Sequence, residues 1–269
     1  MAKKIGVDLG GTSLRAGVIE KNKVLRYVSK STPKTQKELL DAMVSAISEC
    51  MSEDITGIGI ASPGPLKNGI IYNPPNLPFR NFNLQKFLQG KFSKPVKIEN
   101  DAHCVALAEL KLGVKKKNFI VLTLGTGIGG GIIINGEMYE GRGEAGEMGH
   151  IVVHDGKFLE ILWQESREKS KGLFEEKFMI KDLYKMKDTK AKSILEEMYV
   201  YLGQAIGSYI NIFDPEVFVI TGGPREAGER FLKPILKETK KYVTLPTMPP
   251  VQWSKLDYPG MLGAGLLVE

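Results

Sequence analysis

Two cysteines, Cys50 and Cys104, are all that this chain of 269 residues contains. So few cysteines exclude a disulfide framework and a four-cysteine zinc site. The chain also lacks any uninterrupted apolar run of about eighteen residues, so we expect no membrane-spanning helix. The apolar segment after Lys3 and Lys4 is too brief for a secretory signal peptide and is followed by no small-residue cleavage site. We therefore expect a cytoplasmic location.

Strong charge of one sign is also missing, since the formal net charge is only +6 at pH 7. The basic residues are spread along the chain, apart from three lysines at residues 115–117 that are typical of a solvated loop. Hydrophobic residues make up 42% of the chain and charged residues 25%, as in a globular protein long enough for two lobes. We expect neither a nucleic-acid partner nor a membrane partner.

One pattern occurs twice: a strand, a glycine-rich turn, a second strand and a polar turn. The first strands of the two copies are residues 5–9 and 120–124. The turns are Gly10, Gly11 and Thr12 in the first copy and Gly125, Thr126 and Gly127 in the second. Neither turn has the Gly-Lys-Ser/Thr of a Walker loop, and either alone is typical of an ordinary hairpin. Two matched turns, however, could bring backbone N–H groups to a polyphosphate from both sides. Asp8, beside the first turn, is where Mg²⁺ held through water would bind.

A third glycine corner follows a buried-type strand at residues 217–220, at Gly222 and Gly223, and we expect a helix from Glu226 onward. Glycines at a strand-to-helix junction let a nucleotide approach the backbone. The preceding residues 191–213 carry apolar side chains at helical spacing and predict a long helix packed in the core.

The stretch "VKIENDAHCVALAE" places two carboxylates and an amide between a strand and a helix. Asp101 would start the helix, which continues through residues 106–110. Two interpretations compete: Asp101 caps its helix, or it is a catalytic carboxylate at a strand end. The surrounding motifs favour catalysis. Glu99 would point to the opposite face if strand alternation continued, and we interpret it as structural.

Seven segments, in order and over nearly the whole chain, resemble the motifs of the ROK family of sugar kinases. They are "GVDLGGTSLRAGV", "GIGIASPGPL" with "PNLPF", "IENDAHCVALAE", "LTLGTGIGGGIIINGEMYEG", "EAGEMGHI", "VITGGPREAG" and "LGAGLL". The resemblance implies an α/β fold of two lobes, the actin-like or hexokinase-like ATPase fold, with the active site in the cleft between the lobes. It also implies transfer of the γ-phosphate of ATP, with Mg²⁺, to a hexose hydroxyl.

The resemblance further implies roles for single residues. Asp101 matches the family's catalytic base, and Asn100 a ligand of ring hydroxyls. The remaining sugar-binding positions would be Asn76 in "PNLPF", Glu147 and His150 in "EAGEMGH", and Glu160 in "FLE", whose match depends on closing a deletion. The ATP phosphates would lie between the two glycine turns, with Gly222 and Gly223 near the adenosine. Glu144 is left as a solvated loop charge, and His103 stands where the family often has asparagine.

One departure concerns zinc. Most members follow the Gly-His with a cysteine cluster that binds structural zinc together with the histidine, whereas "GEMGHIVVHDGKFLE" contains no cysteine. His150 and His154 have a spacing that could bind zinc on a helix, but the Ile-Val-Val between them favours a strand. We therefore predict no structural zinc, which leaves His150 only the sugar role.

We predict a first lobe over residues 1–113, a second over residues 114–255, and a C-terminal helix at about 256–269 that returns to the first lobe. Glucose is the first choice of substrate, while mannose, fructose, N-acetylmannosamine and N-acetylglucosamine fit the same side chains. ROK repressors carry an additional N-terminal helix-turn-helix domain, for which a first strand at about residue 5 leaves no room. A non-catalytic sugar sensor would not need Asp101 and both phosphate turns, and an actin-like or chaperone ATPase would not need the sugar cluster. The resemblance also implies a homo-oligomer, in the first place a dimer.

Overall fold

The computed structural model describes residues 3–174 and 179–268 and divides into two compact units. Unit 1 comprises Met1–Lys115, Glu140–Glu144 and Lys255–Glu269, and unit 2 comprises Lys116–Tyr139 and Ala145–Ser254. These boundaries differ from the expected lobes mainly at Glu140–Glu144, which groups with unit 1 although it lies within the expected second lobe. In the described part of the chain, no helix is long and apolar enough to cross a membrane.

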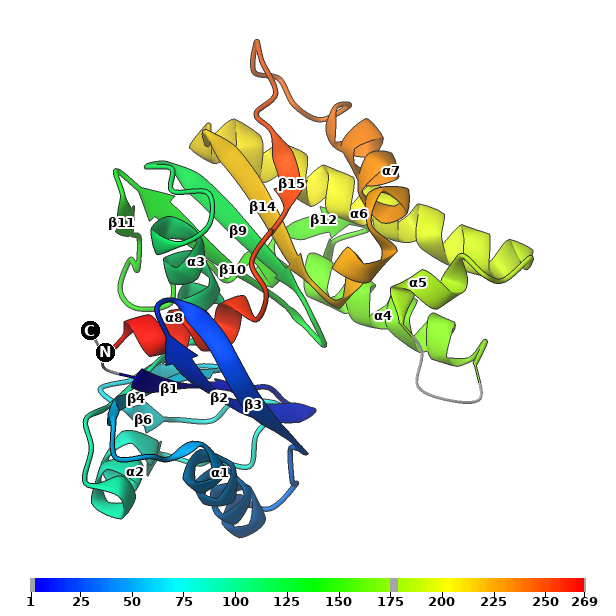
Figure 1. The fold of residues 1–269 in the computed structure, drawn as a ribbon. Coiled ribbons are helices and arrows are strands. Elements are labelled where there is room, and N and C mark those ends of the chain that lie inside the picture. The colour runs from blue at the N-terminus through cyan, green and yellow to red at the C-terminus, as the bar shows by residue number, and fades with distance from the viewer. Residues whose placement is uncertain (1–2, 175–178, 269) are drawn as a thin grey trace. The chain divides into compact units, whose positions relative to one another are not determined.

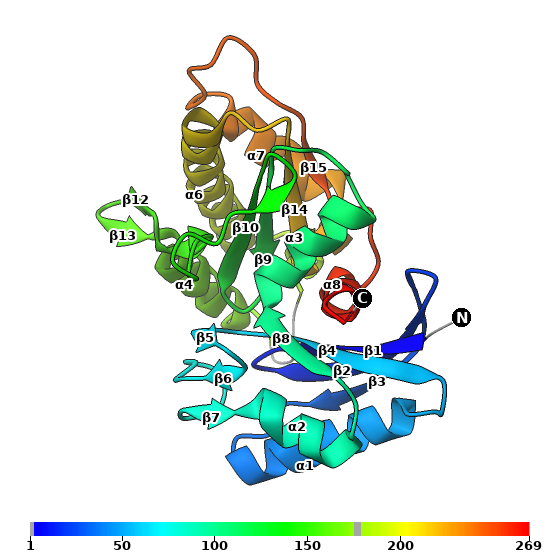
Figure 2. The same ribbon diagram turned by 90° about the vertical axis from the view of Figure 1, so that its left-hand side faces the viewer.

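The elements of unit 1 are β1 (Lys3–Leu9), β2 (Ser13–Glu20), β3 (Lys23–Ser31), α1 (Gln36–Cys50), β4 (Ile55–Ser62), β5 (Leu66–Lys67), β6 (Ile70–Ile71), β7 (Phe82–Asn83), α2 (Leu84–Phe92), β8 (Val96–Asn100), α3 (Asp101–Lys111) and α8 (Pro259–Leu266). The main sheet has the order β3-β2-β1-β4-β8, in which the first three strands form an antiparallel meander and β4 and β8 run parallel to β1. α1 and α2 cover one face of this sheet, and α3 and α8 lie on the other (Figures 1 and 2).

Local sequence explains the start and the orientation of α1. Its N-cap Thr35 accepts a hydrogen bond from the backbone N–H of Glu38 through its hydroxyl, and the same hydroxyl donates to the Glu38 carboxylate. Leu39, Met43 and Ile47 recur every four residues, and all are fully buried. This apolar stripe holds α1 against the sheet.

α8 approaches the sheet at glycines of β1 and β4. A Cβ atom on Gly6 would lie 2.1 Å from the carbonyl oxygen of Met261, and one on Gly59 would lie 1.7 Å from that of Ala264. Both distances are far inside van der Waals contact, so only glycine permits this packing. The C-terminal helix therefore packs in unit 1, where its first turn also reaches Asp8.

The elements of unit 2 are β9 (Phe119–Leu124), β10 (Ile128–Ile134), β11 (Glu137–Met138), η1 (Met148–His150), β12 (Val152–His154), β13 (Lys157–Phe158), α4 (Leu159–Lys171), α5 (Ile180–Leu183), α6 (Thr189–Phe213), β14 (Val217–Gly222), η2 (Gly223–Ala227), α7 (Glu229–Thr239) and β15 (Val251–Trp253). The predicted long helix is α6, which packs against α4 and α7 and contributes eleven buried residues to unit 2. The helix expected from Glu226 is split into the short η2 and α7.

The sheet of unit 2 repeats the topology of unit 1. Its order is β11-β10-β9-β14-β15, in which β9, β10 and β11 form an antiparallel meander and β14 and β15 run parallel to β9. The two meanders are the two copies of the pattern found in the sequence. The glycine turn therefore occupies the same topological place in each unit, at the carboxyl end of the strand that pairs with both its hairpin partner and a parallel neighbour.

Candidate active site

The first glycine turn joins β1 to β2 in unit 1. Leu9 pairs with Leu14, and the N–H of Gly10 donates to the carbonyl oxygen of Ser13 over 2.9 Å. A Cβ atom on Gly11 would lie 2.7 Å from the Cβ of Asn76, so glycine lets the Asn76 loop lie directly against the turn. Two predicted features, the phosphate turn and the exposed sugar-side Asn76, are thus neighbours within unit 1.

Asp8 lies on β1, two residues before this turn. Its Oδ2 is 3.8 Å from Nη1 of Arg15, its partner across the hairpin, and the first turn of α8 lies close by at Gly260. Burial raises the pKa of the Asp8 carboxyl above its ordinary value, and the Arg15 charge opposes this shift. A carboxylate beside a phosphate-type turn offers the hard oxygen donor that Mg²⁺ prefers, so the residues present fit the predicted ion.

The second glycine turn joins β9 to β10 in unit 2 and is one residue tighter. Leu124 pairs with Ile128, so three residues lie between the paired positions, whereas four lie between Leu9 and Leu14. The N–H of Gly125 donates to the carbonyl oxygen of Gly127 over 2.9 Å. The alignment of the two copies therefore holds along the first strand and ends inside the turn.

Three side chains of α4 contact this second turn. Oε2 of Glu160 accepts the N–H of Ile128 over 2.9 Å. Nε1 of Trp163 and Nη1 of Arg167 both donate to the carbonyl oxygen of Gly125, over 3.1 and 3.0 Å. The family resemblance implies a sugar role for Glu160 and gives Trp163 and Arg167 no role. Their spacing, at i, i+3 and i+7 of one helix, is the signal that could have grouped them.

Gly222 and Gly223 differ in what they do. Gly222 has φ of +111°, and a Cβ atom there would lie 2.0 Å from the carbonyl oxygen of Leu124, so it serves the close pairing of β14 with β9. A Cβ atom on Gly223 would meet no atom within 4 Å among the described residues. Only Gly223 therefore leaves open space of the kind that a ligand could approach.

Asn100, rather than Asp101, caps α3. Its Oδ1 accepts the N–H groups of Ala102 and His103 over 2.9 and 3.2 Å. Asp101 is the first helical residue, and its Oδ1 accepts the N–H of Ala102 over 2.8 Å. The capping interpretation of Asp101 thus applies to its neighbour instead. The Asn100 carboxamide oxygen is committed to the helix, which leaves its NH₂ as the group that could reach a sugar; Nδ2 lies 3.6 Å from where a Cβ on Gly64 would be.

Glu99 anchors the same junction from the strand side. Its Oε1 accepts the N–H of Asn100 over 2.7 Å and lies 3.2 Å from Nδ1 of His103, which is only 4% exposed. Burial raises the pKa of the Glu99 carboxyl, but the hydrogen bonds from His103 and the Asn100 N–H outweigh this and lower it overall. The structural interpretation of Glu99 thus gains a specific partner, because His103, the unusual residue of the motif, lies against it.

Glu147 and His150 lie together in unit 2, at either end of η1. Nδ1 of His150 is 3.1 Å from Oε2 of Glu147, and both side chains are about half exposed. His154 lies on β12, in agreement with the strand that the Ile-Val-Val predicts, and it contacts Tyr201. Among residues 3–174 and 179–268, no group of three or more His, Cys, Asp or Glu side chains could hold a metal ion.

The predicted residues thus form two half-sites, each described within its own unit. Unit 1 holds Asp8, Gly10, Gly11, Thr12, Asn76, Asn100 and Asp101, and unit 2 holds Gly125, Thr126, Gly127, Glu147, His150, Glu160, Gly222 and Gly223. In unit 2 the Glu160 carboxylate links two of these groups, since its Oε2 would lie 2.7 and 3.0 Å from Cβ atoms on Gly127 and Gly149. Glu144, which is exposed, groups with unit 1.

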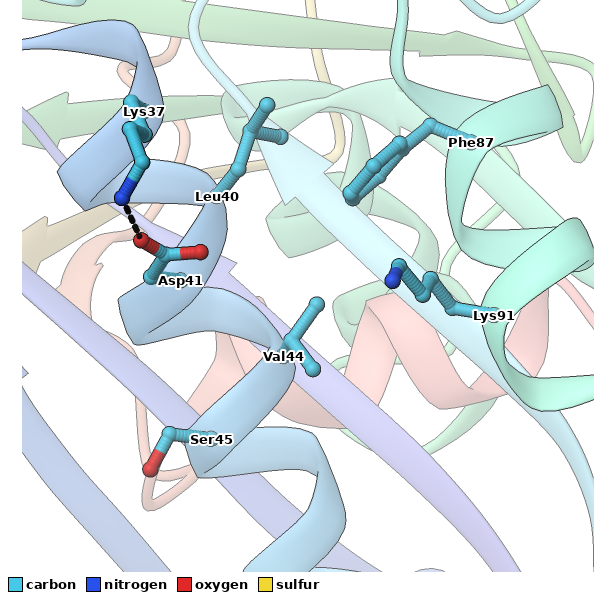
Figure 3. A pocket seen from close by; sticks show the side chains of 7 residues that line it. All are labelled: Lys37, Leu40, Asp41, Val44, Ser45, Phe87 and Lys91. Carbon is cyan, nitrogen blue, oxygen red and sulfur yellow. Dashed lines mark hydrogen bonds and ion pairs between the residues drawn. The ribbon is translucent and has the colours of Figure 1, made fainter.

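Two pockets lie away from these residues. One, of about 420 Å³, lies between α1 and α2, where the close-up shows Leu40, Val44 and Phe87 facing the same space and Lys37 paired with Asp41 at 3.0 Å (Figure 3). The other, of about 470 Å³, lies where α5 meets the start of α6. Neither is lined by a predicted site residue, so the candidate active site rests on the half-sites and not on cavity size.

Comparison with known proteins decides the family, because the chain matches the ROK family over residues 4–269. The chain belongs to the ROK family. A glucokinase of Halalkalibacterium halodurans is 32% identical over 281 aligned positions, covering 88% of this chain and 85% of that protein. The structure of a ROK glucokinase from Streptomyces griseus in complex with glucose and AMPPNP superposes with a TM-score of 0.86 at 27% identity, covering 99% of both chains.

The family also explains the repeated topology, since its glucokinases have the two-lobed hexokinase-like and actin-like ATPase fold. The fold class expected from the sequence is therefore confirmed. ROK proteins include regulators as well as kinases: a xylose repressor of Bacillus spizizenii is 30% identical over 81% of this chain, which corresponds to 62% of the repressor. The likeness to sugar kinases thus covers nearly the whole chain, while the match to the repressor leaves a large part of that protein uncovered.

Proposed function

We propose that this chain is an ATP-dependent hexose kinase and that glucose is its preferred hexose. The observation that carries the proposal is the junction of β8 and α3, where Asp101 is the first residue of the helix that Asn100 caps and its Oδ1 accepts the N–H of Ala102. Such a carboxylate, fixed by its neighbours, suits a general base that must meet one hydroxyl of the substrate. The similarity to glucokinases supports glucose among the hexoses.

In the proposed reaction, Asp101 accepts the proton of the attacking sugar hydroxyl as that oxygen bonds to the γ-phosphorus of ATP and the bond to the β-phosphate oxygen breaks. The Asn100 NH₂ donates to a ring hydroxyl, because its carbonyl oxygen is committed to α3. Glu147, His150 and Glu160 supply further acceptors and donors for the ring. Asp8 would hold Mg²⁺ through water, and the bound ion would supply positive charge that offsets the charge of the phosphates.

The nucleotide half of the proposal rests on the backbone. In this proposal the two glycine turns bind the phosphates through backbone N–H groups, and the adenosine takes the open space at Gly223. A homodimer, which the family resemblance implies, remains a prediction that sedimentation of the purified protein would test.

The test is a coupled assay for ADP release with purified protein, ATP and Mg²⁺ across glucose, mannose, fructose, N-acetylmannosamine and N-acetylglucosamine. We expect turnover that depends on added sugar and is fastest with glucose. Turnover fastest with another hexose would correct the substrate but keep the kinase. Sugar binding without any ADP release would favour the non-catalytic sensor, and release that ignores every sugar would favour a plain ATPase.

A further inference from the structure

Side chains on one face of α4 donate to and accept from the backbone at the second glycine turn. The contacts are those of Glu160, Trp163 and Arg167 described above, and Trp163 is 2% exposed while Gly125 and Thr126 are exposed. A buried indole and a guanidinium therefore both donate to one carbonyl oxygen and fix the direction in which it points. The residues thereby fix the peptide unit to which the carbonyl belongs.

The geometry of the Gly125–Thr126 peptide determines where the Thr126 N–H points. The Gly125–Thr126 peptide is trans, and in a trans peptide the C=O and the following N–H point to opposite sides of a plane. Because the Gly125 carbonyl points toward α4, the Thr126 N–H must point away from α4. In the described part of the chain, that N–H has no acceptor, whereas the Gly125 N–H is used inside the turn.

Charge adds to the effect. Donation to a carbonyl oxygen polarises the whole peptide, so a cationic donor makes the N–H of the same unit a stronger donor in turn. Burial lowers the pKa of the Arg167 guanidinium but leaves it a cation at neutral pH. Arg167 can therefore strengthen the Thr126 N–H without contacting the ligand that this N–H meets.

We propose that Trp163 and Arg167 are positioning residues for phosphoryl transfer, which orient and polarise the Gly125–Thr126 peptide so that the Thr126 N–H binds a phosphate oxygen of the nucleotide. The proposal rests on the proposed kinase function and deepens it by adding two residues that act through the backbone. It also gives a reason for the long side chains at these places on α4.

The first test compares Arg167→Met and Arg167→Lys in steady-state kinetics. Arg167→Met removes one charge-assisted bond while Trp163 still holds the carbonyl, so we expect KM for ATP to rise about 10-fold, with KM for the sugar unchanged. Arg167→Lys keeps a cationic donor and restores most of the loss. Lys171→Gln is the matched control, because it removes the same charge from the same helix at a residue that pairs with Glu168, and it leaves both KM values unchanged.

The second test uses fluorescence and needs no turnover. In Trp253→Phe, Trp163 is the sole tryptophan; the replacement loses no hydrogen bond seen in the described residues, since Nε1 of Trp253 is buried without a partner there. We expect the non-hydrolysable analogue AMPPNP to change the Trp163 emission, and glucose alone to leave it unchanged. This experiment tests the contact between Trp163 and the nucleotide-binding turn even where Arg167→Met fails to fold.

The outcomes separate the two proposals. Wild-type protein that binds no ATP would remove the proposed function itself. Wild-type protein that binds ATP, with equal KM for ATP in Arg167→Met and wild type, would overturn the positioning role alone. So would equal rises of KM for ATP and for sugar, which would indicate general damage to unit 2, or an unchanged Trp163 emission on AMPPNP binding.

Discussion

Replacing Glu99 by alanine tests how the β8–α3 junction is held. The substitution removes the acceptor of the Asn100 N–H, at 2.7 Å, and the partner of His103 Nδ1, at 3.2 Å. A hydrogen bond to a charged group contributes about 1.5–3 kcal/mol, and an unsatisfied buried polar group costs about 1–3 kcal/mol. Because the Glu99 side chain is 34% exposed, solvent replaces part of what is lost. We therefore expect the free energy of unfolding to fall by about 2 kcal/mol.

The lowered pKa of Glu99 also predicts how the stability difference changes with pH. The folded-state pKa of Glu99 is lowered from 4.5, so its carboxylate stabilises the fold above the unfolded value and loses that contribution as pH falls through the folded value. Urea unfolding of wild type and Glu99→Ala should differ at pH 7, and the difference should shrink as pH falls below about 4.5 and on through the lower folded-state pKa of Glu99. Lys97→Ala, an exposed neighbour on the same strand, is the control and should unfold like wild type at each pH. Equal stability of Glu99→Ala and wild type at pH 7, or a difference that stays constant into acid, would refute the reasoning.

Three further predictions concern packing, the metal and zinc. Gly59→Ala places a Cβ atom 1.7 Å from the Ala264 carbonyl oxygen and should lower the free energy of unfolding by about 3 kcal/mol. Gly90 lies within α2, and a Cβ atom there would meet no atom within 4 Å among the described residues, so Gly90→Ala should raise the free energy of unfolding by about 0.5–1 kcal/mol. Equal urea midpoints for the two variants would contradict this prediction. Asp8→Asn should lower kcat at least about 10-fold at low Mg²⁺ and recover partly as Mg²⁺ is raised, while an unchanged Mg²⁺ dependence would remove Asp8 from the ion's environment. Elemental analysis of purified protein should find far less than one zinc per chain, and one tightly bound zinc would overturn the prediction from the missing cysteines.

The repeated hairpin with its glycine turn could be predicted from the sequence because it rests on short-range signals. Strand runs, glycine turns and a polar turn lie within about thirty residues of each other in each copy, and the register of each hairpin follows from them. The start of α3 was also predictable, since a polar residue before an apolar helical stretch marks a helix start. Which of two adjacent polar residues caps the helix was not, because Asn and Asp are about equally good caps.

The features that the sequence did not predict depend on contacts between residues far apart in the chain. Trp163 and Arg167 lie 38 and 42 residues from Gly125 in the sequence, and no local pattern predicts a side chain that donates to a distant carbonyl oxygen. The same holds for Gly6 and Gly59, whose role depends on a helix near the other end of the chain. The grouping of Glu140–Glu144 with unit 1 likewise reflects packing rather than composition.

The most direct test of the central claim is kcat of Asp101→Asn with saturating ATP and glucose. Asparagine keeps the shape of the side chain and an oxygen that can accept the Ala102 N–H, but it cannot accept the proton of the sugar hydroxyl. We predict that kcat falls by roughly 10² to 10⁴-fold while KM for ATP stays near the wild-type value. Turnover by Asp101→Asn close to that of wild type would contradict the assignment of Asp101 as the base.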